Sequence, residues 1–168
     1  ADAVLKVLDT YPAAFESAWL QTIRRKLGLA TEHADDLTLA RDVHHLMAAE
    51  RHDHTLFWRR LSQSVCQWQS GLPWGQAIRI VTDHVVDRAA WDAWLNRYRL
   101  RCQAEGHSDQ GQRMLGVNPK YVLRNHLAEL AIQAAQQGDP TLVRDLLSVL
   151  QSPYDEHPAH ADWAELPP

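Results

Sequence analysis

The clearest start and stop signals for helices lie near the carboxyl end of the sequence, in residues 118–153. Asn118 followed by a proline is typical of a helix N-cap and first helical position. Gly138 can adopt the left-handed conformation that ends such a helix, and an Asp-Pro pair at 139–140 repeats the opening signal. Because Pro153 supplies a second stop, the pattern predicts an antiparallel pair of helices joined by a short loop.

The first helix of this pair is expected to be buried on two sides. At ~100° per residue its apolar residues form two stripes, which together cover more than half of its circumference. One stripe is Leu123, Leu127, Leu130 and Ala134, and the other is Tyr121, Ala128, Ile132 and Ala135.

Two cations, Lys120 and Arg124, lie between these stripes, and no acidic residue shares their line. On the buried side of a helix they need partners or must extend to solvent, since an unpaired buried charge is costly. One interpretation is structural ion pairs with carboxylates of neighbouring segments. The alternative is contact with a phosphate or an acidic partner, which the positive end of a helix dipole favours. These two residues form the candidate site, and we identify no catalytic residue.

The amino-terminal part of the chain predicts one or two helices over residues 2–28. Pro12 can break the helix or restart it, and Gly28 can end it. The apolar residues after the proline recur at helical spacing, which indicates a buried face. They are Phe15, Trp19, Ile23 and Leu27.

Two further amphipathic helices are expected over residues 35–50 and 87–103. Asp87 is a candidate N-cap for the second of them, and its aromatic face should lie in the core. Asp53 plausibly caps a short helix between the two.

The remaining segments read mainly as connections. Residues 64–86 are interrupted by glycine and proline, with a short helix expected around residues 76–82, and residues 104–117 form a polar connection. No segment alternates as a strand does. The sequence therefore predicts an all-α fold with a single helical domain of about six to eight helices over residues 1–153, followed by an extended C-terminal tail over residues 154–168.

Composition and charge exclude several classes of protein. The chain has 17 basic and 21 acidic residues, interspersed, and a net charge of −4, so neither a nucleic acid nor a membrane surface is an expected partner. Cys66 and Cys102 match no metal spacing and favour a reducing compartment, which predicts a cytoplasmic location. Histidines cluster near Asp53, but they lack the pattern of three or four converging ligands that a metal site needs.

Short segments along nearly the whole chain resemble the C-terminal region of the SelO family, whose members are pseudokinase-like protein adenylyltransferases. The segments occur in the order of the family, which makes the resemblance more specific than any one match. They are NPKYVLRN at 118–125, GD at 138–139, SPYDE at 152–156, RKLG at 25–28, LM at 46–47 with DHT at 53–55, and DRAAWDAW at 87–94.

The resemblance implies that the chain corresponds to the C-terminal helical part of a kinase-like fold. It also implies that the full-length protein transfers AMP from ATP to Ser, Thr or Tyr hydroxyls of proteins, with magnesium. The family's catalytic and nucleotide-binding residues would precede Ala1, so none is carried over, and the fragment is expected to be inactive and to hold no cofactor. Its implied partners are the N-terminal catalytic lobe of the same chain and the protein substrates. The alternative is a stand-alone helical protein-interaction module.

Overall fold

The computed structural model describes residues 2–106 and 108–166, and within these ranges it contains helices and connecting segments but no strand. The all-α prediction is therefore confirmed for the described residues. Their nine α-helices exceed the predicted number partly because α4 and α5 are single turns. The elements are α1 (Asp2–Lys26), α2 (Asp36–Ala49), α3 (His54–Gln69), α4 (Trp74–Ala77), α5 (Arg79–Thr82), α6 (Arg88–Glu105), α7 (Gln110–Leu115), α8 (Asn125–Gln136), α9 (Thr141–Gln151) and the 3-10 helix η1 (Pro158–Ala164).

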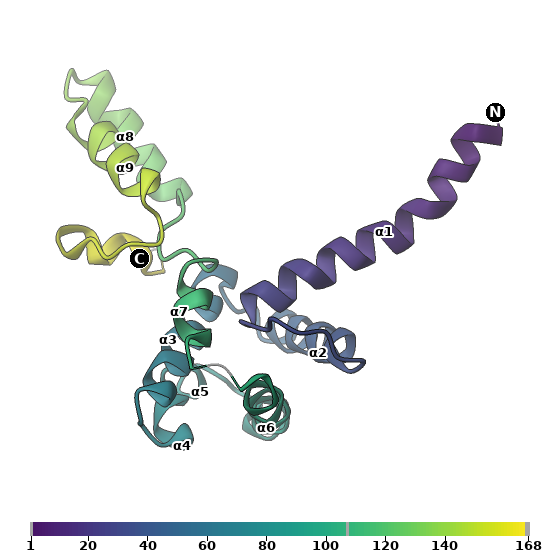
Figure 1. The fold of residues 1–168 in the computed structure, drawn as a ribbon. Helices are drawn as coiled ribbons and strands as arrows, with labels where there is room; N and C mark the ends of the chain where they lie inside the picture. The colour runs from purple at the N-terminus through teal and green to yellow at the C-terminus, as the bar shows by residue number, and fades with distance from the viewer. Residues whose placement is uncertain (1, 107, 167–168) are drawn as a thin grey trace.

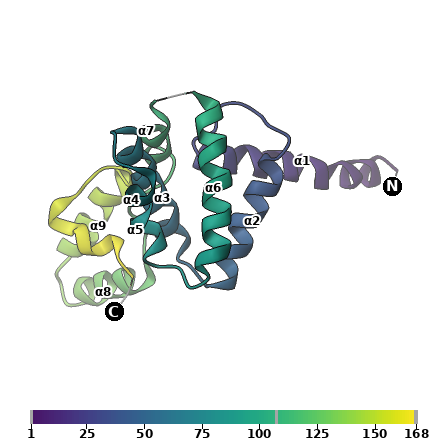
Figure 2. The ribbon, with the colours of Figure 1, turned by 90° about the horizontal axis from the view of Figure 1, so that it is seen from below.

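The body of the molecule is built from α2, α3, α6 and α7, and two elements extend from it in different directions. Helix α1 runs away from the body toward its amino terminus, while the α8–α9 pair stands on the other side (Figure 1). Helices α2 and α6 lie side by side (Figure 2), and α3 packs against α5 and α7. Because α1 contacts the body through its carboxyl-terminal part, much of its length is left without a neighbour.

The main core is rich in aromatic side chains, as the pattern of residues 87–103 predicts. Trp91, Trp94 and Tyr98 of α6 are almost completely buried. Trp94 Nε1 donates a hydrogen bond to the Leu39 carbonyl, and the Tyr98 hydroxyl donates to the Leu27 carbonyl, both at 2.9 Å. The polar atoms of these rings therefore tie α6 to α2 and to the end of α1.

Of the aspartates predicted as helix caps, Asp53 and Asp87 serve as caps, whereas Asp139 lies one residue before Pro140, the N-cap of α9. The Asp53 side chain accepts from the Leu56 N–H at 2.8 Å, and Asp87 accepts from the Ala90 N–H at 3.1 Å. The helix after Asp53 is longer than expected, because α3 continues to Gln69 into the segment read as a connection. The cap residue fixes where a helix begins, but the packing of its apolar face decides how far it continues.

The predicted break at Pro12 is wrong, because α1 is continuous through it. This part of the helix is exposed, so water can satisfy the carbonyl that loses its partner, and the lost hydrogen bond is tolerated. The predicted burial of Phe15 is also wrong, since its side chain is 57% exposed, whereas Ile23 and Leu27 are buried.

The predicted helix start at Asn118 is wrong, because α8 begins at Asn125. Asn118 is fully buried, and its side-chain amide donates to the Lys26 carbonyl and to Ser62 Oγ, both at 2.9 Å. The amide is thus occupied by contacts between distant segments and does not cap a helix. The chain that follows is held by the Pro153 carbonyl, which accepts from two successive backbone N–H groups.

Helix α8 is buried on one side only, so the prediction of burial on two sides is wrong. Leu127 and Ala131 face α9 and are buried. Leu130 and Ile132 are 51% and 52% exposed, and Leu123 precedes the helix. The short loop between α8 and α9 is as predicted, and Gly138 adopts a positive φ of 91°.

The segment after Pro153 differs from the extended tail that we expect from its prolines. Residues Pro158–Ala164 form the 3-10 helix η1, whose first residue is a proline with a suitable fixed φ. Trp163 packs against both small apolar clusters, one formed by α8 and α9 and the other centred on Tyr121. This packing holds the segment against the α8–α9 pair and Tyr121, while Tyr154 is 43% exposed.

The polar connection expected over residues 104–117 contains a short helix, α7, that packs closely on α3. Gly111 makes this approach possible, because a Cβ at this position would lie 2.6 Å from both N and Sγ of Cys66. Its N–H also donates to Gln69 Oε1 at 2.9 Å. The backbones of α3 and α7 can therefore pack this closely only with glycine here.

Gly111→Ala is expected to lower the free energy of unfolding by about 1–3 kcal/mol, because the added methyl group must displace the α3 backbone. Gly116→Ala is the matched control, since its Cβ would meet no atom closer than 3.6 Å and its φ is −76°. Urea denaturation of both variants measures the difference. Equal losses at the two positions would contradict this account of the packing.

Candidate functional site

The segment of residues 117–124, between α7 and α8, carries the two cations singled out by the sequence. Lys120 Nζ lies 2.5 Å from Glu156 Oε2, and Arg124 Nη1 lies 2.7 Å from Asp53 Oδ2. Arg124 Nη2 also donates to the Ala164 carbonyl at 3.3 Å. The structure thus places both cations against acceptors from other segments, and neither lies on a helix.

The Asp53 carboxylate makes two kinds of contact, because it caps α3 and also accepts a hydrogen bond from Arg124. Burial would raise the pKa of Asp53, but the Arg124 guanidinium and the Leu56 N–H hold it below its usual value. A carboxylate that accepts from an arginine and a backbone amide remains charged. The Asp53–Arg124 pair therefore fixes the start of α3 to the residues just before α8.

Glu156 lies on the other side of the same segment and accepts from two cations. Besides Lys120, it receives Arg59 Nη2 at 3.0 Å, and these hydrogen bonds lower its pKa although partial burial opposes them. Arg59 is buried in α3, and its Nη1 also donates to the carbonyls of Leu115 and Asn118. The tail and residues 117–124 are thereby both tied to α3.

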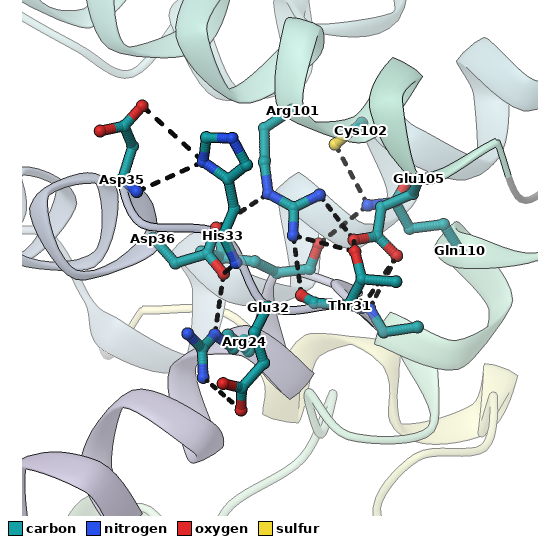
Figure 3. A network of polar contacts seen from close by, with 12 residues as sticks. Arg24, Thr31, Glu32, His33, Asp35, Asp36, Arg101, Cys102, Glu105 and Gln110 are labelled. Atoms are coloured by element: carbon teal, nitrogen blue, oxygen red, sulfur yellow. Dashed lines mark hydrogen bonds and ion pairs between the residues drawn. The ribbon is translucent and has the colours of Figure 1, made fainter.

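A second charge network, which the sequence did not reveal, joins α1, α2 and α6 (Figure 3). At its centre is Asp36, which is 1% exposed. Its carboxylate lies 2.8 Å from Arg24 Nε through one oxygen and 2.8 Å from Arg101 Nε through the other. It also accepts from the His33 N–H at 2.9 Å. One buried carboxylate thus holds two cations from two other helices.

Glu105 extends this network at the end of α6. Its buried carboxylate accepts from the Ala30 N–H at 2.9 Å, from Thr31 Oγ1 at 2.5 Å and from Arg101 Nη1 at 2.6 Å. Burial alone would raise the pKa of Glu105, but these donors lower it to about 2. The loop after α1 is therefore fastened to α6 by a carboxylate that stays charged at neutral pH.

The sequence contains a partial signal for this network. Arg101 and Glu105 are four residues apart on one helix, a spacing that brings side chains together. The sequence also predicts that Arg97, Arg99 and Arg101 are solvated or ion-paired and that Asp35 or Asp36 opens the helix of residues 35–50. Because Asp36 and Arg101 are 65 residues apart, no local pattern indicates that they meet.

In chemical terms, both networks fix the positions of charges and show no reactive group. Within residues 2–106 and 108–166, no three His, Cys, Asp or Glu side chains are grouped so that they could hold a metal ion. Burial raises the pKa of the Cys102 thiol to about 12, and burial also raises that of Cys66. Neither thiol is therefore activated as a nucleophile at neutral pH.

A helix that crosses a lipid bilayer must be both long and apolar. No helix formed by the described residues meets both conditions.

Comparisons with known proteins agree with the SelO resemblance. A family model described as "Protein adenylyltransferase SelO" matches residues 1–151. Proteins called "Protein nucleotidyltransferase YdiU" from Burkholderia multivorans, Cupriavidus metallidurans and Pseudomonas fluorescens are 44%, 41% and 39% identical over 99% of this chain. The matches cover 31%, 30% and 33% of those relatives, so the chain spans about a third of their length. Since the family model covers most of the sequence, the chain belongs to the SelO family.

Proposed function

We propose that this chain is the C-terminal helical scaffold of a protein adenylyltransferase. In the longer protein, AMP would pass from ATP to Ser, Thr or Tyr hydroxyls of protein substrates, and the helices described here would support the catalytic part. The SelO match over residues 1–151 supports the family, and the limited coverage of the relatives supports a role as one part of a larger enzyme. The two unpaired cysteines are in keeping with a reducing compartment, and we place the protein in the cytoplasm.

The observation that carries this proposal is an aromatic stripe on α1 that continues beyond the body. Ile23 and Leu27 of the stripe are buried and Trp19 is half-buried, whereas Phe15 and Tyr11 are 57% and 63% exposed. The three aromatic residues of the stripe, Tyr11, Phe15 and Trp19, border a groove of about 740 Å³ between α1 and α2. Exposed aromatic residues in line with a buried face are typical of a surface that another part of a protein covers. We infer that the catalytic part of the longer protein packs here.

The nucleotide and magnesium would be held outside this chain. Magnesium needs oxygen ligands that are free to coordinate it, usually carboxylates. The carboxylates of Asp36, Asp53 and Glu105 each accept from an arginine and from at least one backbone amide. These three carboxylates therefore offer magnesium no free ligand, and we assign them no step of the transfer.

Isothermal titration calorimetry tests whether the nucleotide is bound outside this chain. The 168-residue chain is expected to show no micromolar binding of ATP in the presence of MgCl₂. The full-length relative from Burkholderia multivorans, titrated under the same conditions, should bind. A micromolar dissociation constant for the isolated chain would contradict the proposal.

The aromatic stripe gives a second prediction, which separates a scaffold from an independent interaction module. Tyr11→Ser combined with Phe15→Ser should leave the melting temperature of the 168-residue chain unchanged, because both side chains are exposed there. In the longer protein the same change should remove about 3–6 kcal/mol of stabilisation, since each buried large apolar side chain contributes about 1.5–3 kcal/mol. Thermal melts measure the stability of both proteins, and an adenylylation assay measures the activity of the longer one.

The control for this experiment lies on the opposite side of α1. Ala13→Ser combined with Ser17→Ala changes two exposed positions away from the stripe and should alter neither protein. If the Tyr11 and Phe15 changes left the longer protein equally stable and active, the stripe would serve a different partner. The interaction-module alternative would then replace the scaffold.

A further inference from the structure

Four helices end with the same pair of backbone hydrogen bonds. Three of them have glycine at the position of positive φ, and the fourth has a different residue there. In this arrangement, the two residues after the C-cap donate back to carbonyls of the last turn, and the first of the two adopts a positive φ. Helices α1, α3 and α8 place Gly28, Gly71 and Gly138 there, with φ of 71°, 102° and 91°. Helix α2 places Arg51 there, with φ of 54°.

Arg51 is the one non-glycine residue with positive φ in the part of the chain that the structure describes. A side chain is unfavourable in this conformation because its Cβ crowds the backbone, which is why glycine is usual. Three other helices of this chain use glycine at the equivalent position. An arginine at this position therefore suggests that its side chain has a use that offsets the strain.

The Arg51 side chain borders an open pocket of about 490 Å³ at the junction of α2 and α3. Arg60 of α3 and Arg124 also line it, so three arginines border one space. Arg124 is paired with Asp53, but Arg51 and Arg60 make no ion pair with any of the described residues. Two positive charges at the pocket thus lack a counter-charge from the part of the chain that the structure describes.

The two acidic residues at the pocket do not neutralise these arginines. The Glu50 carboxylate accepts from the N–H groups of Val86 and Asp87 at 3.0 Å and 2.8 Å, and lies 2.9 Å from His52 Nε2. Asp53 is engaged by Arg124 and by its own helix cap. The positive charge is local, because the whole chain has a net charge of −4.

We propose that this pocket binds a phosphoryl dianion through Arg51 and Arg60, with an apolar portion of the ligand resting on Leu56 and Leu166. Guanidinium groups present several N–H donors in a plane and match the oxygens of a phosphate in a bidentate manner. Leu56, Phe57 and Leu166 line the same pocket, and Leu166, which is 60% exposed, supplies most of its apolar surface. The ligand class is a phosphate monoester carried on an apolar body.

NMR titration of the ¹⁵N-labelled 168-residue chain tests this pocket with two defined probes. Phenyl phosphate is expected to bind with a dissociation constant on the order of 1 mM, and to shift the amide signals of residues 50–60. Inorganic phosphate should bind several-fold more weakly, because it lacks the apolar body.

Two substitutions connect binding to the arginines. Arg51→Gly suits the positive φ and should hold the melting temperature within about 3 °C of the original while weakening phenyl phosphate binding about tenfold. Arg60→Gln, on the helix α3, should weaken it by a similar factor. Arg144→Gln makes the same charge change at an exposed position of α9 and should leave binding unchanged.

Two results would overturn the proposal. One is the absence of phenyl phosphate binding at concentrations up to about 20 mM, which is far above the dissociation constant expected for paired guanidinium contacts. The other is binding that persists unchanged in a folded Arg51→Gly protein and a folded Arg60→Gln protein.

Discussion

Asp36→Asn is expected to lower the free energy of unfolding of the 168-residue chain by about 3–5 kcal/mol, because it removes the charge of the buried carboxylate to which Arg24 and Arg101 both donate. The Asp36 carboxylate is 1% exposed and accepts from Arg24 and Arg101 at 2.8 Å each. Asparagine has almost the same shape but no charge, and its NH₂ group would face one of the two guanidinium groups. The loss would therefore come from electrostatics and hydrogen bonding, with little change in packing.

A control on the same helix separates this effect from the loss of any ion pair. Asp42 of α2 pairs with Arg97 of α6 at 2.5 Å, but their side chains are 38% and 49% exposed. Asp42→Asn should cost about 0–1 kcal/mol, since solvent and salt screen an exposed pair. Urea denaturation at neutral pH, followed by far-ultraviolet circular dichroism, measures both variants. Similar small losses would show that the Asp36 network contributes little to stability.

The positions of many helices could be predicted from the sequence because their signals are local. Asp53 and Asp87 each accept from the backbone N–H three residues further along the chain, and Gly138 ends α8 within one turn. Asn118 carries the same kind of signal and fails, since its amide meets Lys26 and Ser62 from distant parts of the chain. A capping residue therefore predicts a helix only when no buried partner competes for its side chain.

Burial was harder to predict than helix position. Periodicity shows which side chains share one face of a helix, but it does not show whether another element covers that face. The α1 stripe illustrates this, because Ile23 is buried while Phe15, two turns earlier, is exposed. The same holds for Leu130 and Ile132 of α8.

The candidate site could be predicted in part. Lys120 and Arg124 stood out from the sequence as cations in an apolar setting, and in the structure they meet Glu156 and Asp53. The partners could not be derived, because they are 36 and 71 residues away. The positive φ of Arg51 could not be predicted either, since it depends on how α2 ends and arginine is not a residue type that favours this conformation.

Glu105 connects the stability of the fold to pH, in a direction set by its lowered pKa. Its carboxylate is fully buried in the folded chain and has donors from Ala30, Thr31 and Arg101. These contacts lower the pKa from 4.5 to about 2. A carboxylate with a lowered pKa stabilises the folded state above its unfolded pKa, and this contribution is lost as the pH falls toward the folded value.

Glu105→Gln should therefore be destabilised relative to the original chain at pH 6, and the gap should narrow between about pH 4.5 and pH 2 by up to about 3 kcal/mol. Urea denaturation of both proteins at pH 6, 4.5, 3.5 and 3 follows the gap through the upper part of this window. Glu32→Gln is the control, because the Glu32 side chain pairs with Arg24 but is 81% exposed, so its curve should run parallel to that of the original chain. A constant gap for Glu105→Gln would mean that the loop after α1 is held to α6 by packing, since loss of the Glu105 charge would then make no difference.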